Sequence, residues 1–121
     1  MDLIKREYHI ALFEIYKELL TEKQQEYFTL YYFDDLTLSE IAENKDVSRN
    51  AVFDQVKKVI LILENYENKL GVYQNKLSLK EFASKLSKEL KEELLTIIKE
   101  WYYGVWWIIK SFTNGLTSYY R

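Results

Sequence analysis

Hydrophobic residues recur every three or four positions over most of the chain, which is the period of an amphipathic helix. One run consists of Val52, Val56, Val59, Leu63, Tyr66 and Leu70. Another consists of Leu79, Phe82, Leu86, Leu90, Leu94, Ile97, Trp101, Val105 and Ile108. The pattern predicts an all-α fold. The chain has no proline and three glycines, and this scarcity of turn residues argues against a β protein.

Capping residues mark where the predicted helices begin. Thr21, Thr37 and Ser78 are each followed three residues later by Gln or Glu, the spacing of a capping box. Caps and periodicity together predict helices over residues 2–19, 22–33, 38–45, 49–70 and 79 to at least 101. Residues 27–33 have the composition of a strand, but the upstream cap and the lack of a partner strand favour a helix. Gly71 is placed to end the long fourth helix.

Residues 36–58 have the pattern of a helix-turn-helix, with a short capped helix, a tight turn and a second capped helix. Ala42 is small where the two helices must cross closely. The turn position four residues later is most often glycine, because it takes a left-handed conformation. Here it is Asp46, which tolerates that conformation better than most residues. Such a pair presents its second helix outward, shaped to enter a major groove. The alternative is a three-helix core that binds no nucleic acid.

The outward side of that second helix supplies the candidate contacts to DNA. Arg49 suits guanine or a phosphate, and Asn50 suits adenine. Phe53 suits a thymine methyl group or, alternatively, marks a protein contact. The lysines suit phosphates. The predicted nucleic-acid-binding residues are Arg49, Asn50, Phe53, Asp54, Lys57 and Lys58.

The charge distribution weakens the prediction of DNA binding. The formal net charge is −2, and residues 1–60 carry 8 basic and 12 acidic side chains. Residues 45–58 have a net charge of only +2, a thin electrostatic footprint for a monomer. Asp54 lies in the middle of the predicted reading face, where it accepts from cytosine or pairs with a neighbouring lysine. Two copies of the chain would roughly double the footprint.

The long fourth helix carries more apolar surface than one small core can cover. Residues 59–63 are apolar on every side, and a helix of that kind must be covered on several sides. We therefore expect a homodimer, although a stripe at helical spacing also suits a core. The predicted interface residues are Val59, Leu63, Tyr66, Leu70, Trp101 and Trp106.

We divide the chain into a helix-turn-helix domain over 1–73 and a C-terminal helical interaction segment over 74–121. The C-terminal helix packs on the fourth helix or on a second subunit.

The chain lacks the residues that several classes of protein require. With no cysteine and only His9, the chain has neither a thiolate metal site nor a histidine cluster. No glycine-rich phosphate loop is present, and no nucleophile is placed beside a base. We expect that the protein is not an enzyme and binds no metal or cofactor, and that His9 has a surface or capping role.

The apolar run 101–109 is about half the ~20 residues that span a bilayer. Its Trp and Tyr residues suit a protein interface or a membrane surface. The charged N-terminus has no export signal, so we expect a cytoplasmic protein.

Residues 31–42, 47–54 and 64–73 resemble the YlxM-like helix-turn-helix proteins of Firmicutes and mollicutes, and the string SRNAVFD at 48–54 is the most specific part. The same block is more distantly similar to the promoter-reading domain of bacterial sigma factors. The resemblance implies a small all-helical cytoplasmic protein encoded beside the genes of the signal recognition particle GTPases, with a regulatory role in protein targeting. It implies no individual site residue.

Two hypotheses about function follow. In the first, the chain is a dimeric regulator that reads DNA through the helix-turn-helix. In the second, it is a protein-interaction or RNA-binding module of the targeting machinery, which keeps the fold without specific DNA binding and acts through its aromatic C-terminal helix. The acidic balance of residues 1–60 favours the second hypothesis, and the outward Arg49 and Asn50 favour the first.

Overall fold

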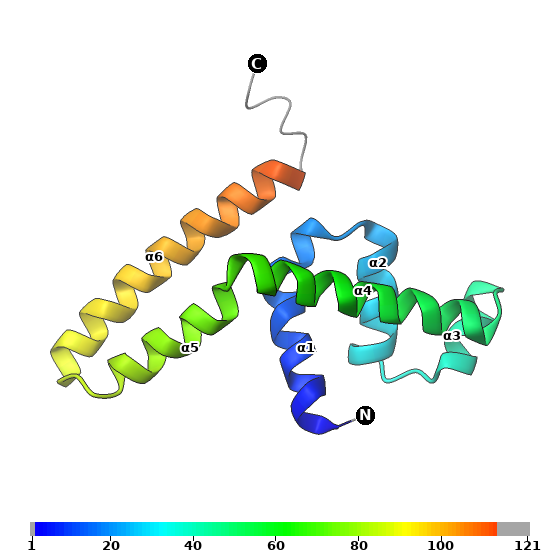
Figure 1. Ribbon diagram of the computed structural model, residues 1–121, viewed down its shortest axis with the longest axis horizontal. Helices are drawn as coiled ribbons and strands as arrows, with labels where there is room; N and C mark the ends of the chain where they lie inside the picture. Colours follow the sequence, from blue (N-terminus) through cyan, green and yellow to red (C-terminus); the bar gives the residue numbers. More distant parts are fainter. Residues whose placement is uncertain (1, 114–121) are drawn as a thin grey trace, which may run out of the picture. The chain divides into compact units, whose positions relative to one another are not determined.

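The computed structural model describes the backbone of residues 2–113 and the side chains of residues 2–100, and within these bounds it contains helices and no strand. The all-α prediction is confirmed. The elements are α1 (Leu3–Tyr16), η1 (Lys17–Leu19), α2 (Glu22–Phe28), η2 (Thr29–Phe33), α3 (Leu38–Lys45), α4 (Arg49–Leu70), α5 (Val72–Ala83) and α6 (Lys88–Thr113) (Figure 1). The chain forms two compact units, one ending at Leu70 and the other beginning at Gly71.

The predicted caps of the first unit hold its helices at the expected residues. Thr21 and Gln24 form a complete capping box at the start of α2. The Thr37 side chain accepts from the backbone N–H of Glu40 at the start of α3. Gly71 takes a left-handed φ of 62° and ends α4 where the sequence predicts.

Three helix predictions need correction. The first helix tightens into the 3₁₀ turn η1 after Tyr16. The second widens into the π-helix η2, where the Asp34 N–H donates to the Thr29 carbonyl at 3.0 Å. The continuous helix from residue 79 to 101 is wrong. A helix resumes directly after Gly71, so Ser78 lies inside α5 and caps nothing. The next helix begins only after Ser87, whose side chain accepts from the Leu90 N–H at 3.4 Å.

Stacked aromatic rings form the centre of the first unit. The rings of Phe13 and Phe28 stack at 4.2 Å between centroids, and those of Phe28 and Tyr32 stack at the same distance. These rings join α1, α2 and η2. Aliphatic residues complete the core, and they are Leu12, Leu20, Ile41, Val52, Val56, Val59 and Leu63.

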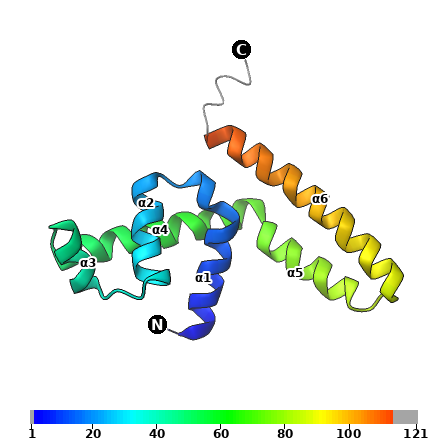
Figure 2. The same cartoon turned by 180° about the vertical axis from the view of Figure 1, so that it is seen from behind.

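Helix α4 supports the whole first unit along one of its sides. In Figure 1 it passes in front of α1 and α2, and in the reversed view of Figure 2 these two helices lie in front of it. Its buried residues Val52, Val59 and Leu63 face that side. No other helix of this unit covers the opposite side.

The second unit is an antiparallel hairpin of α5 and α6 (Figure 1). Among its described side chains, Ala83 is buried, whereas Phe82, Leu90 and Ile97 are each more than half exposed. The predicted apolar stripe is therefore only partly covered within residues 71–100.

The stacked core makes a direct prediction about stability. Phe28→Ala should lower the free energy of unfolding by about 3–5 kcal/mol, because it removes a fully buried ring between two others. Phe82→Ala is the matched control, since that ring is 56% exposed, and it should cost less than about 1 kcal/mol. Urea denaturation followed by circular dichroism measures both. Equal costs would contradict this description of the core.

Candidate nucleic-acid interface

The turn between α3 and α4 has the geometry that the sequence predicts. Asp46 takes a left-handed φ of 53° and its backbone N–H donates to the carbonyls at the end of α3. The Val47 N–H donates to the Ala42 carbonyl at 3.0 Å, which closes the turn. The Ser48 side chain accepts from the Ala51 N–H at 3.1 Å and starts α4. Ile41 and Ala42 are buried at the crossing, so α3 and α4 form a helix-turn-helix unit.

The predicted reading residues lie together on the exposed N-terminal half of α4. All six are exposed to solvent, and they are Arg49, Asn50, Phe53, Asp54, Lys57 and Lys58. The Phe53 ring is 49% exposed, and the Lys57 ammonium lies 6.0 Å from its centroid. An exposed aromatic ring beside a cation is available to an incoming ligand. Whether any of the six contacts DNA stays a prediction.

The predicted interface residues occupy different environments. Val59 and Leu63 are fully buried within the first unit, so their apolar surface is already covered inside the chain. Tyr66 is half-buried, with its ring 5.9 Å from that of Tyr16. Leu70 is 51% exposed. The side chains of Trp101 and Trp106 lie outside the described residues.

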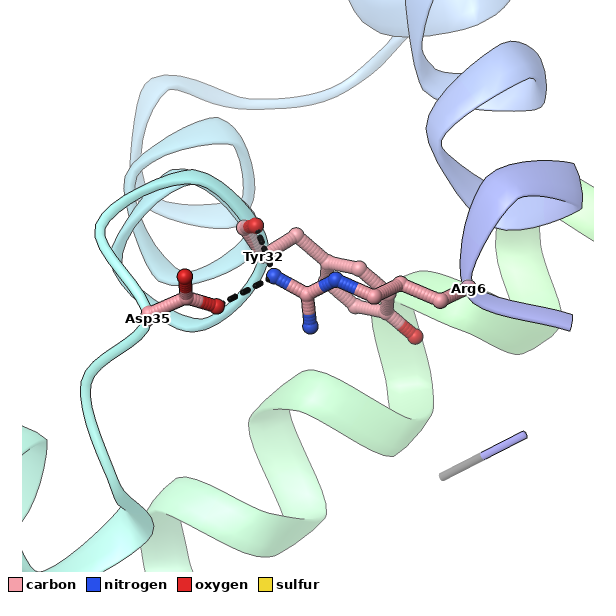
Figure 3. A network of polar contacts seen from close by, with 3 residues as sticks. All are labelled: Arg6, Tyr32 and Asp35. Atoms are coloured by element: carbon pink, nitrogen blue, oxygen red, sulfur yellow. Dashed lines mark hydrogen bonds and ion pairs between the residues drawn. The ribbon is translucent and has the colours of Figure 1, made fainter. Parts of the chain in front are cut away.

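A contact from outside the helix-turn-helix fixes the segment that leads into it (Figure 3). Arg6 reaches from α1, and its guanidinium donates to the Tyr32 carbonyl and to the Asp35 carboxylate, the latter at 2.5 Å. It also lies 5.4 Å from the centroid of the Tyr32 ring. Asp35 has a left-handed φ of 53°, an uncommon conformation for a residue with a side chain. Arg6 therefore holds the bend between η2 and α3 in place.

His9 joins the same network to α4, which corrects the expected surface or capping role. It is buried, with its Nε2 3.0 Å from Glu64 Oε1 and its Nδ1 3.0 Å from the Tyr32 hydroxyl. Because a carboxylate only accepts, Nε2–H donates to Glu64. In the neutral ring Nδ1 then accepts from Tyr32. Nothing in the local pattern of α1 signals this pairing, because the partners follow 23 and 55 residues later.

The Tyr32 phenol carries a shifted pKa. Burial raises the pKa from its ordinary 10.0 to about 12, with a further increase from Tyr31 and an opposing effect of Arg6. The phenol therefore stays protonated and can donate to His9 under ordinary conditions.

Within the described chain, no group of three or more His, Asp or Glu residues could hold a metal ion. No helix in that part of the chain combines the length and apolar character that a membrane span requires.

Residues 3–101 match the family described as "Putative helix-turn-helix protein, YlxM / p13 like". The chain belongs to this family, UPF0122. A UPF0122 protein of Bacillus mycoides is 49% identical over 82 residues, which cover 68% of this chain and 74% of the relative. UPF0122 proteins of Bacillus thuringiensis and Bacillus anthracis are 48% identical over the same shares. The resemblance noted from residues 31–73 is thus confirmed.

The Arg6 contact predicts a specific loss of stability in this UPF0122 protein. Arg6→Ala should lower the free energy of unfolding by about 1–2 kcal/mol, because it removes charge-assisted hydrogen bonds at a partly exposed site. Lys5→Ala, an exposed neighbour on the same helix, should change it by less than about 0.5 kcal/mol. Chemical denaturation of both variants measures the difference. An Arg6 variant as stable as the Lys5 variant would show that the contact contributes nothing.

The Tyr32 phenol predicts a loss of stability in alkali. The unfolded chain releases this proton near pH 10, whereas the folded chain holds it to about pH 12. The free energy of unfolding should therefore fall as pH rises through that range. Tyr32→Phe removes the group, so its stability should fall less steeply over the same pH range. Denaturant unfolding at several alkaline pH values measures both slopes, and identical slopes would contradict the assignment.

Proposed function

We propose that this UPF0122 protein is a DNA-binding regulator that reads DNA with the N-terminal half of α4. The observation that carries the proposal is the exposed group of Arg49, Asn50 and Lys57 on the N-terminal half of the second helix of a helix-turn-helix. Such a helix end is the part of the motif that enters a major groove. The gene-neighbourhood expectation of the family extends the proposal to regulation of protein targeting by the signal recognition particle, in the cytoplasm.

Each exposed residue of this end has a distinct role in the proposal. Arg49 and Asn50 reach base edges, where their bidentate groups suit guanine and adenine. Lys57 and Lys58 lie about two turns further along and contact phosphates, which positions the helix. Phe53 lies between them with its ring half exposed, and it contacts a thymine methyl group.

A second candidate function rests on Asp54 and Phe53. A carboxylate within the reading face is repelled by phosphates, and a half-exposed ring is typical of a protein contact. In this candidate the chain keeps the fold but binds protein or RNA components of the targeting machinery.

Fluorescence anisotropy with three labelled probes separates the candidates. The probes are the DNA upstream of the protein's own gene, a scrambled duplex of equal length and the signal recognition particle RNA, each over a salt series. A regulator should bind the upstream DNA most tightly, with an affinity that falls steeply as salt rises. Weak and equal binding to both duplexes would remove the DNA proposal, and tight binding to the RNA alone would favour the second candidate.

Two substitutions on α4 test the assigned roles. Arg49→Ala should cost about 1–3 kcal/mol of specific binding free energy and reduce the difference in affinity between the upstream and scrambled duplexes. Lys57→Ala should weaken binding to both duplexes alike and reduce the slope of log affinity against log salt by about 1. Lys69→Ala, an exposed lysine at the far end of the same helix, is the control and should change neither. Equal effects of all three would mean that α4 does not read DNA in this orientation.

A further inference from the structure

The side of α4 that faces away from the core carries an apolar patch flanked by charges. Leu61 is 55% exposed there, directly opposite the buried Val59 and Leu63 on the helix. An open hollow of about 320 Å³ lies against this side. The residues that line it recur at steps of three and four, so they form one stripe, and they are Asp54, Lys57, Lys58, Leu61, Ile62 and Asn65. We refer to these six residues as the outer stripe.

We propose that a second copy of the chain docks on the outer stripe, with its own α4 antiparallel and the two Leu61 side chains in contact. This dimer covers Lys57 and Lys58, so it excludes DNA, and it therefore differs from the dimeric DNA reader of the first sequence-based hypothesis. The self-association follows from the structure alone, and only the competition with DNA rests on the proposed function.

Charge complementarity selects a second copy as the occupant. Lys57 lies four residues before Leu61 and Glu64 three residues after it, and the two are seven residues apart, about two turns. They therefore lie on the same edge of the stripe. Glu64 accepts from His9 through Oε1, and its side chain is still 40% exposed on that edge. In an antiparallel pair that crosses at Leu61, Lys57 of one copy comes level with Glu64 of the other to within about 1.5 Å along the axis. The two-fold symmetry makes this ion pair twice.

The remaining polar residues of the stripe find partners in the same arrangement. Lys58 lies three residues before Leu61, and Asn65 lies four residues after it on the same side. Asp54 and Asn68 lie seven residues before and after Leu61. The amide of Asn65 accepts from the lysine, and the amide of Asn68 donates to the carboxylate. The carboxylate that is unfavourable beside phosphates thus gains a donor in the dimer.

The length of α4 explains why this dimer excludes DNA. The helix continues nine residues past Leu61, to Leu70, which is about 13 Å. Laid antiparallel, that end of the partner helix reaches the level of Val52. It therefore lies over Lys57 and Lys58 and takes the space of the DNA backbone. An interface made by one helix pair belongs with the small, transient ones, below roughly 1,200 Å², so we expect the dimer to dissociate on dilution and the monomer to be the form that binds DNA.

Two leucines on opposite sides of α4 provide a matched test of self-association. Leu61→Gln and Leu70→Gln make the same uncharged change at similar exposures, 55% and 51%. Sedimentation velocity over a concentration series should show a monomer–dimer equilibrium for the unchanged protein. Leu61→Gln should raise the dimer Kd about tenfold or more, a change of about 1.4 kcal/mol, and Leu70→Gln should leave it unchanged. The proposal would be overturned if the unchanged protein stayed monomeric at every concentration. It would also be overturned if only Leu70→Gln weakened the dimer.

A labelled duplex added to the same samples tests the competition. DNA should convert dimers to complexes with one chain at each binding site. At high protein concentration, the Leu61→Gln variant should bind the duplex with a lower apparent Kd than the unchanged protein. If instead dimers bound the duplex cooperatively, and Leu61→Gln weakened that binding, the proposed competition between dimer and DNA would be overturned. If no variant binds DNA, the proposed function fails while the sedimentation result still decides the self-association.

Discussion

Helix α4 must bury one side in the core and present the other side to solvent, and the rest of the first unit depends on that constraint. Its inner side carries Val52, Val56, Val59 and Leu63, against which α1, α2 and α3 are arranged. Its outer side carries the exposed residues from Arg49 to Asn65. Because a single helix does both, any change in how the core holds α4 also changes the orientation of the candidate DNA contacts.

The polar network around Tyr32 supports that orientation from behind. Arg6 fixes the bend before α3, and His9 ties Tyr32 to Glu64 on α4. The network thus connects α1 to the bend before α3 and to α4. Its directly bonded members are separated by up to 55 residues in the sequence. It adds polar contacts to the apolar core that holds α4 in place.

Local signals in the sequence were sufficient for much of this fold. The caps at Thr21 and Thr37 and the turn at Asp46 act on neighbouring residues, so α3 and α4 could be predicted closely. The helix start predicted at Ser78 is wrong, because the same spacing of Ser and Glu also occurs inside a helix. Gly71 allows a new helix to begin directly after α4. The helical spacing places Val59 and Leu63 on one apolar side, but whether the chain's own core or a second copy covers that side depends on distant residues. The contacts of Arg6 and His9 depend on distant residues as well. The exposed reading residues were predicted as a group because helical spacing alone places them on one side.

The most direct test of the central claim is to map, by amide NMR, where a DNA duplex binds the full chain. At low ionic strength phosphate contacts do not depend on sequence, so any short duplex suffices for a titration of the ¹⁵N-labelled protein. If α4 reads DNA, the chemical shift changes should be concentrated between Arg49 and Lys58 on α4, with small changes in α5. Changes concentrated on α5 and the first turns of α6, with α4 unaffected, would contradict it.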